Sequence, residues 1–172
     1  MEMNMKTLLL IRHGKSSWKD PALTDLQRPL KKRGIRNARE MGERLGKLEH
    51  GVERVFTSPA RRTVETLELM AEAAGFGADA SEVVADLYSF DYDDLMVAVG
   101  KTDDRWQSVA VVGHNPAITD LVNFLALEHI VNIPTCGIAL LRLDIRRWRD
   151  LRAGCARLEH YDFPKNDSDS ED

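Results

Sequence analysis

The 172-residue sequence has little of several features that mark particular classes of protein. Its two cysteines, Cys136 and Cys155, are too few for a disulfide framework and are expected to be reduced thiols in a cytoplasmic protein. No apolar run approaches the roughly 20 residues that cross a bilayer. The apolar run at residues 8–11 is also too short for an export signal and is followed at once by charge. These absences argue against a disulfide-stapled secreted domain and against a membrane protein.

An excess of positive charge is also missing. The formal net charge is -4 and the pI is near 5.8, which argues against general binding of nucleic acid or anionic membranes. A hydrophobic content of 43% is ordinary for a globular chain of this length. We find no internal repeat and no interior linker. One domain is therefore expected over residues 1–164, followed by an acidic tail at residues 165–172 that is expected to be disordered. The oligomeric state is left open.

Short apolar runs alternate with helical periodicities along the chain. Buried strands are predicted at residues 6–11, 53–57 and 108–113, and two late strands, placed at the sheet edge, at residues 137–145 and 155–163. Helical spacing is found over residues 35–48, 60–74 and 117–127. Gly75 is the predicted C-cap of the second helix, and Asn115 and Pro116 the predicted N-cap and first position of the third. This alternation predicts an α/β fold, a single-domain three-layer sandwich with a mostly parallel central sheet flanked by helices.

Unusual polar residues follow three of the predicted strands. Ligands of parallel α/β sheets bind beyond the carboxyl ends of the strands, where helix N-termini add N–H donors that suit an anion. If the three strands are neighbours, two histidines and at least two arginines converge there. The residues concerned are Arg12, His13, Arg62 and His114.

Such a cluster favours a phosphoryl group. Arginines in one pocket repel each other unless a multiply charged anion lies between them, and their planar fork matches phosphate oxygens. Neighbouring cations also lower a histidine pKa, so that a neutral imidazole could attack a bound phosphoryl group. Taken singly, each residue would be a structural histidine or an ion-pair arginine. A zinc site at His13 and His114 is disfavoured because the adjacent arginines oppose a dication. The three remaining histidines lack this setting and are interpreted as structural: His50, His129 and His160.

At these residues the sequence resembles a known family. "LLLIRHGKSSW", "TSPARRTVET" and "VAVVGHNP" resemble, in order and spacing, the motifs of the histidine phosphatase superfamily, also called phosphoglycerate mutase-like, over residues 6–163. The variant "RHGKSSW…DLQRPLKKRG" is most similar to the branch of the phosphohistidine phosphatase SixA. The resemblance implies a phosphoglycerate mutase-like fold and a phosphatase that needs no metal and no cofactor.

The resemblance also implies a role for each matching residue. His13 would be the nucleophile that is phosphorylated transiently. Arg12 and Arg62 would clamp the phosphoryl oxygens, and His114 would donate a hydrogen bond to the same group. Ser16 stands where many relatives carry a threonine near the phosphate and is a weaker candidate for substrate binding.

Some positions depart from the family pattern. Lys15 and Lys19 replace an acidic residue and an asparagine, which makes the rim of the site more basic. Glu65 stands where a glutamine often precedes the threonine of the second motif. Arg62 is preferred to Arg61 because it has the family's spacing to that threonine.

A convincing general acid is missing. The region that supplies it in larger relatives offers Glu82, Asp86 and Asp91, of which Asp86 is the best guess. Taken singly, each of them is better interpreted as a solvent-exposed residue at the start of a helix. An imidazole leaving from phosphohistidine depends less on such an acid than a sugar alkoxide does. A short chain also leaves little for a lid, so an open site can admit a phosphorylated side chain on a folded protein. We therefore expect a protein phosphohistidine phosphatase.

Two alternatives stay open: a small-molecule phosphomonoesterase acting on a sugar or nucleotide phosphate, and a phosphate-binding module without catalysis. The expected partner is accordingly a phosphorylated protein or a small phosphorylated substrate, with no nucleic acid and no membrane. The stretch from Arg28 to Arg39 holds six cations and no acid. It could steer an acidic partner, but a solvated helix face is the favoured interpretation.

Overall fold

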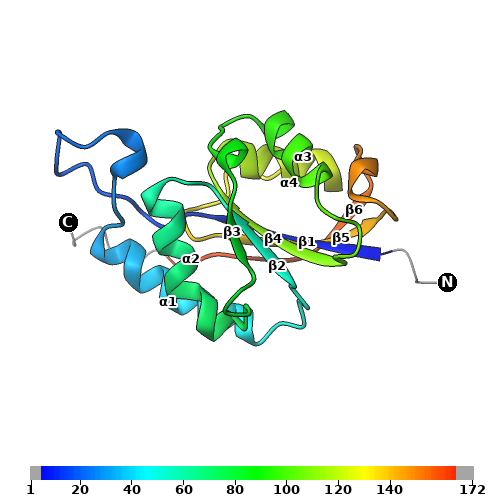
Figure 1. Cartoon of the computed structure of the whole chain (residues 1–172), viewed down its shortest axis with the longest axis horizontal. Helices are drawn as coiled ribbons and strands as arrows, with labels where there is room; N and C mark the ends of the chain where they lie inside the picture. The colour runs from blue at the N-terminus through cyan, green and yellow to red at the C-terminus, as the bar shows by residue number, and fades with distance from the viewer. Residues whose placement is uncertain (1–4, 166–172) are drawn as a thin grey trace.

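Helices and strands alternate along residues 5–165, the part of the chain that the computed structural model describes (Figure 1). The strands are β1 (Met5–Arg12), β2 (Arg54–Thr57), β3 (Ser81–Val83), β4 (Ser108–Gly113), β5 (Ile138–Asp144) and β6 (Ala156–Asp162). The α helices are α1 (Lys32–Gly46), α2 (Arg61–Ala74), α3 (Tyr92–Gly100) and α4 (Ala117–Ala126), with short 3-10 turns η1 (Asp25–Gln27), η2 (Ala85–Leu87) and η3 (Trp148–Asp150).

The six strands form one sheet in the order β3-β2-β4-β1-β5-β6. Neighbours from β3 to β1 run parallel, whereas β5 pairs antiparallel with β1 and β6 pairs antiparallel with β5. The predicted mostly parallel sheet is therefore confirmed. Of the two late strands only β6 lies at the edge, because β5 pairs with β1 on its other side.

Helices cover both faces of the sheet, α1 and α2 on one and α3 and α4 on the other (Figure 1). Along β1, Leu8 and Leu10 belong to the core under α3 and α4, and Leu9 and Ile11 to the core over α1 and α2. A strand buried on both faces has no polar alternation, which explains its continuous apolar run. This arrangement is the predicted three-layer sandwich.

The helix boundaries agree with the predicted ones in one case and differ in another. Gly75 ends α2 with a φ of 79°, a left-handed conformation that glycine adopts without strain, so the predicted C-cap is confirmed. The N-terminus of α4 was placed one residue too early. Pro116 is the N-cap and Ala117 the first helical residue, while the Asn115 side chain accepts a hydrogen bond from the backbone N–H of Thr119 at 3.1 Å.

A loop of residues 18–28 projects from the carboxyl edge of the sheet (Figure 1). Its base is closed by two backbone hydrogen bonds of 2.8 Å, from Ser17 to Pro29 and from Lys31 to Lys15. Gly34 of α1 packs against this base so closely that a Cβ would lie 2.3 Å from the Lys15 carbonyl oxygen. The absence of a side chain there lets the loop sit on the helix.

The predicted domain of residues 1–164 stays a prediction, and the predicted disordered tail lies, apart from Lys165, outside the described residues. Within residues 5–165, every helix is too short or too polar to serve as a bilayer-spanning segment.

Candidate active site

Three neighbouring strands, β2, β4 and β1, end at the same edge of the sheet. Arg12 of β1 lies opposite Gly113 of β4, and Thr57 of β2 opposite Val112. The residues that follow these strands therefore meet, and the rings of His13 and His114 are 5.3 Å apart. The structure thus brings together the four residues predicted to converge. We call Arg12, His13, Arg62 and His114 the histidine site.

His13 presents one free ring nitrogen. Its Nδ1 lies 2.7 Å from the Gly14 carbonyl oxygen, which can only accept, so Nδ1 carries the proton and the lone pair of the neutral ring is on Nε2. Only 9% of the residue is exposed. Burial above all, with the charges of Arg62 and Arg12, lowers the pKa of His13 to about 4 against the opposing effect of that hydrogen bond. The imidazole is therefore neutral and nucleophilic at physiological pH.

Both arginines of the site keep a donor without a partner. Arg62, only 2% exposed, donates Nη1 to the Asp25 carbonyl at 2.7 Å and Nη2 to the Asp25 carboxylate at 3.0 Å. Arg12 donates Nη1 to the Ile133 carbonyl at 2.8 Å. Among the residues that the structure describes, the Nε atoms of these two arginines are the only buried side-chain nitrogen or oxygen atoms left without a hydrogen bond. A buried donor without a hydrogen bond costs about 1–3 kcal/mol in stability. Binding an oxyanion that accepts from these Nε–H groups is therefore favoured.

His114 has both ring nitrogens engaged. Its Nε2 lies 2.8 Å from the Ser58 hydroxyl and its Nδ1 3.3 Å from Nη2 of Arg62. Burial, with the charges of His13 and Arg62, lowers the pKa of His114 to about 3. Because a guanidinium only donates, Nδ1 is the acceptor here and Nε2 donates to Ser58. A hydroxyl can also donate, so the opposite tautomer, with a proton on Nδ1, keeps the Ser58 bond. The predicted hydrogen bond from His114 to a phosphoryl group requires that second tautomer.

Asp25 is the residue at this site that the sequence reasoning missed. Its carboxylate accepts four side-chain hydrogen bonds, two from Arg28, one from Arg62 and one from the Tyr88 hydroxyl. Burial raises the pKa of Asp25, but the bonds from Tyr88 and Arg62 outweigh it and lower the pKa to about 2. The carboxylate is ionised and saturated, so it balances two arginines and has no proton to give. Its only sequence signal was an acid three residues before the arginine in "DLQR".

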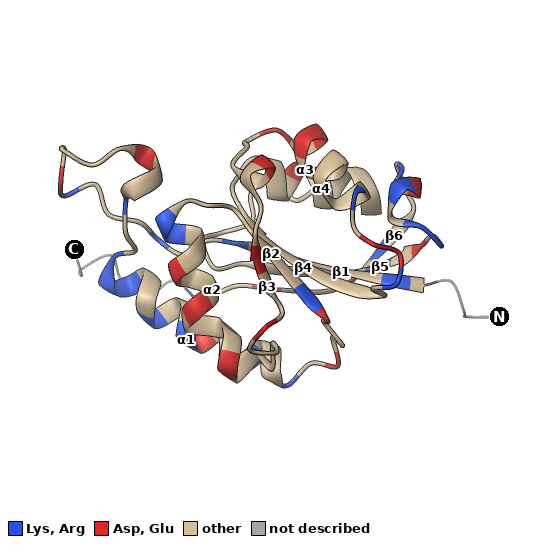
Figure 2. Ribbon diagram, viewed as in Figure 1, with Lys and Arg blue, Asp and Glu red and all other residues tan. Residues whose placement is uncertain are grey.

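Ser16 is placed beside another cation of the loop. Its hydroxyl accepts a 2.7 Å hydrogen bond from Arg28, which is buried. The role of Ser16 in substrate binding stays a prediction. Further along the basic stretch, exposed cations lie on the N-terminal half of α1 (Figure 2), so only part of the stretch is the predicted solvated helix face.

The two adjacent arginines of the second motif lie in different surroundings. Arg61 is exposed and pairs with Glu65 at 3.3 Å, whereas Arg62 points into the buried site. Glu65 also accepts from the Leu30 backbone at 3.2 Å and so helps to anchor the projecting loop. The hydroxyl of Thr66 accepts from the backbone N–H of Gly14 at 2.9 Å, which ties α2 to the residue after the nucleophile candidate.

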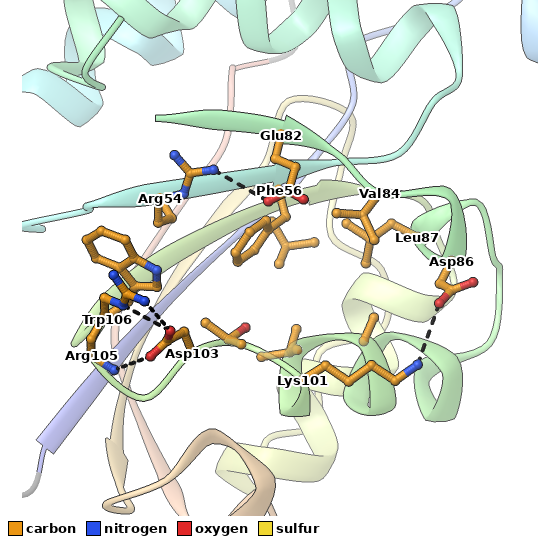
Figure 3. A pocket seen from close by; sticks show the side chains of 14 residues that line it. Arg54, Phe56, Glu82, Val84, Asp86, Leu87, Lys101, Asp103, Arg105 and Trp106 are labelled. Carbon is orange, nitrogen blue, oxygen red and sulfur yellow. Dashed lines mark hydrogen bonds and ion pairs between the residues drawn. The ribbon is translucent and has the colours of Figure 1, made fainter. Parts of the chain in front are cut away.

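The three carboxylates considered as a general acid are engaged elsewhere. Glu82 pairs with Arg54 at 3.4 Å, Asp86 with Lys101 at 3.8 Å, and Asp91 caps the first turn of α3. Asp86 lines a cleft of about 420 Å³ between α3 and the β2–β3 side of the sheet, shown in Figure 3. No residue of the histidine site lines that cleft. The position of Asp86 therefore does not support the expectation that it is the acid.

Of the three histidines interpreted as structural, His50 is buried and has partners that fit this interpretation. Its Nε2 bonds to the Ala74 carbonyl at 2.7 Å and its Nδ1 accepts from the Val52 backbone at 3.0 Å. The ring thus ties the end of α2 to the segment before β2.

Comparison with known proteins gives three kinds of match. The family model described as the histidine phosphatase superfamily (branch 1) matches residues 8–98. An uncharacterized protein of Mycobacterium tuberculosis is 33% identical over 166 residues, which cover 90% of this chain and all of the relative. The solved structure of the protein histidine phosphatase SixA complexed with tungstate has 26% identity and a TM-score of 0.73, covering 90% of this chain and 95% of that one. A mycobacterial glucosyl-3-phosphoglycerate phosphatase has 16% identity and a TM-score of 0.64 over 90% and 97%, a likeness of fold alone.

Proposed function

The chain belongs to the histidine phosphatase superfamily, and on this premise we propose that it hydrolyses phosphohistidine in proteins through a phosphorylated His13. The family and its phosphatase neighbours support phosphatase activity as such. The mechanism and the substrate are the proposal. One observation carries it: the unpartnered Nε donors of Arg12 and Arg62 in the same buried site as a neutral His13.

In the first step the Nε2 lone pair of His13 attacks the phosphorus of a substrate N–P bond. The Nε–H groups of Arg12 and Arg62 hold the phosphoryl oxygens and balance their charge, and His114 donates from Nδ1 in its second tautomer. The substrate ring is protonated by solvent on its second nitrogen. As the new bond forms, the N–P bond to the substrate breaks, and its electron pair stays on what is now a neutral imidazole.

In the second step water attacks the phosphorus of phospho-His13. The bond to Nε2 breaks, its electron pair returns to the ring, and inorganic phosphate leaves while the water proton passes to solvent. The hydrogen bond from Nδ1 to Gly14 holds the ring in one orientation through both steps. The same two arginine donors serve each step, since the phosphoryl group occupies one place.

The leaving group is the reason to favour phosphohistidine. Expelling a sugar alkoxide needs a proton from a general acid, a contribution of about 10²–10⁴ in rate. The carboxylate found at this site, Asp25, is ionised with a pKa of about 2 and cannot supply that proton. A phosphohistidine ring takes its proton from solvent on the second ring nitrogen, so a neutral imidazole leaves without an acid supplied by the protein. A phosphohistidine substrate fits the groups that are present.

The decisive experiment compares hydrolysis of a protein carrying phosphohistidine with a panel of sugar and nucleotide phosphates at equal concentration. We expect kcat/KM to favour the phosphohistidine by about 10² or more, the contribution of the absent acid. Hydrolysis of the esters alone would reject the proposed substrate and leave the family assignment intact. A chain that binds phosphate and hydrolyses neither would instead be a binding module.

A further inference from the structure

Two exposed aromatic residues are connected to the Asp25 carboxylate, each through a different side chain. Trp18 is 74% exposed and Phe90 is 46% exposed. Single exposed apolar residues are normal on protein surfaces, but a pair connected to one candidate active site suggests a surface for recognition. How each ring is connected to the site decides what it can recognise.

Trp18 is joined to the histidine site by an arginine. The Arg28 guanidinium lies over the indole, with its carbon 3.5 Å from the ring centroid, and donates to the Asp25 carboxylate at 3.1 Å. The same carboxylate accepts from Arg62 at 3.0 Å. Two residues, Arg28 and Asp25, therefore separate an exposed tryptophan from Arg62 of the site.

Phe90 contacts the site itself and is connected to Asp25 through Tyr88. Its ring centroid lies 5.2 Å from that of His114 and 5.7 Å from that of Tyr88. The Tyr88 hydroxyl donates to the same Asp25 carboxylate. Phe90 is thus an exposed ring directly against the histidine site.

The spread of these rings fits a macromolecule better than a small metabolite. Trp18 stands at the start of the projecting loop, beyond the Arg28 side chain, whereas Phe90 touches His114 itself. An aromatic side chain buries about 150–250 Å² when it is covered. A partner that covers both rings must reach beyond the Arg28 side chain. Among the exposed charged residues close to Trp18 in the sequence, Lys15 and Lys19 outnumber Asp20, which favours acidic groups on that partner.

We propose that Trp18 and Phe90, with Lys15 and Lys19, form the surface on which a folded phosphoprotein docks. The phosphoprotein would contact the two rings with an apolar patch beside its phosphohistidine and the two lysines with acidic residues next to that patch. This inference rests on the proposed function. Docking also removes water from the ion pair between Arg28 and Asp25, which strengthens the network that holds Arg62. A small phosphorylated molecule makes no use of Trp18, which reaches the histidine site only through Arg28 and Asp25.

The test compares two N–P substrates on the full chain. One is N-phosphoimidazole, and the other is the best substrate among three folded acidic proteins whose surface histidines have been phosphorylated with phosphoramidate. The measured quantity is the ratio of kcat/KM for the protein to that for N-phosphoimidazole. Replacing a tryptophan anchor of an interface typically costs a tenfold or larger change in affinity, so Trp18→Ala should lower this ratio by about tenfold. Phe90→Ala should lower it in the same direction.

A matched pair of leucines controls for the loss of exposed apolar surface. Leu26 lies in the projecting loop next to Asp25, whereas Leu127, 66% exposed, follows the C-terminal end of α4, ten residues of helix away from the histidine site. Leu127→Ala should leave the ratio unchanged. Leu26→Ala should lower it by less than Trp18→Ala, because the leucine buries less area.

Each outcome of the comparison decides the proposal. A ratio that Trp18→Ala leaves unchanged overturns it. Equal losses on both substrates also overturn it, because they would show that Trp18 acts only by supporting Arg28. If the wild-type chain hydrolyses N-phosphoimidazole and its kcat/KM for every phosphoprotein is no higher, the docking surface is rejected and the proposed function is not. Hydrolysis of neither N–P substrate rejects the proposed function and the docking surface together.

Discussion

Two charged regions beside the same sheet differ in how their charges are partnered. In the cleft of Figure 3, Arg105 pairs with Asp103 at 2.8 Å and Arg54 with Glu82 at 3.4 Å; Arg105 and both carboxylates are exposed and Arg54 is partly exposed. At the histidine site, Arg62 is buried and shares its carboxylate partner with a second arginine, and its Nε has no partner. The two regions hold similar side chains and differ in desolvation.

This difference shows why a count of charges does not find an active site. Exposed ion pairs are worth about 0–1 kcal/mol, and among the described residues the cleft has no buried side-chain donor without a partner, so nothing in it requires a ligand. A buried donor without a partner costs about 1–3 kcal/mol, which an oxyanion at the histidine site would recover. Burial also keeps both histidines neutral, as their lowered pKa values show. Changes in the two regions should therefore have very different effects on turnover.

The largest expected effect is that of His13→Ala. Loss of the nucleophile should lower kcat by about 10⁴- to 10⁶-fold, as removal of a covalent nucleophile does in other hydrolases. Acid-quench labelling with radioactive substrate should show a base-stable, acid-labile phosphate on the wild-type chain and none on the variant. Undiminished turnover in His13→Ala would remove this residue as the nucleophile.

Arg62→Ala against Arg105→Ala tests the comparison directly. Removing a buried, preorganised donor to the transition state should lower kcat by about 10²–10³, whereas the exposed arginine of the cleft should change it less than twofold. Steady-state assays of both variants against the same N–P substrate measure the contrast. Comparable losses would mean that the cleft takes part in turnover, and the distinction between the regions would fail.

Asp25→Asn should have a smaller effect than loss of Arg62. The amide cannot accept four donors, so Arg62 loses one of its fixed positions, and misplacement of a positioned group can cost up to about 10²-fold in rate. The matched control is Asp103→Asn, which also removes a carboxylate bonded to an arginine. Inhibition by inorganic phosphate should weaken in parallel in Asp25→Asn. A kcat loss with unchanged phosphate inhibition would argue that Asp25 does not act through the arginines.

The sequence alone predicts that the residues of the histidine site lie together, because three of them directly follow predicted strands. Continuous apolar runs such as residues 8–11 require strands buried on both faces, and such strands lie side by side in parallel sheets. Arg12 and His13 follow one of them directly, and His114 follows another. The register of the sheet then brings their side chains together without further information.

The parts that were missed depend on contacts between distant segments. Asp25 and Tyr88 are 63 residues apart and meet only because the projecting loop folds over the site. Strand β3 has three exposed residues, so it offers no hydrophobic period, and α3 begins within a run of acids that is also typical of a solvated loop. A lone acid three residues before Arg28 forms no recognisable pattern in the sequence. The sequence pattern therefore predicts where Arg62 lies, whereas its partner Asp25 is known only from the tertiary structure.

The pH profile of phosphoenzyme formation should separate a buried histidine from an exposed one. A protonated imidazole has no free lone pair, so the rate must fall as pH drops through the pKa of His13. With that pKa lowered to about 4, at least about nine-tenths of the rings are neutral at pH 5.5, against about one-tenth at the ordinary value of 6.5. Single-turnover rates should therefore change by less than twofold between pH 7.5 and 5.5, after correction for spontaneous hydrolysis. A tenfold fall over this interval would show that the site is open to water.

The smallest expected effect is that of a chelator. The positive charge that balances the phosphoryl oxygens comes from Arg12 and Arg62, and these cations would repel a divalent metal ion from the same place. Incubation with EDTA should therefore leave kcat/KM for an N–P substrate within experimental error of the untreated protein. A loss of activity that returns on adding zinc or magnesium would contradict the arginine clamp. It would also mean that the two unpartnered Nε donors, on which the contrast between the two regions depends, do not account for phosphate binding.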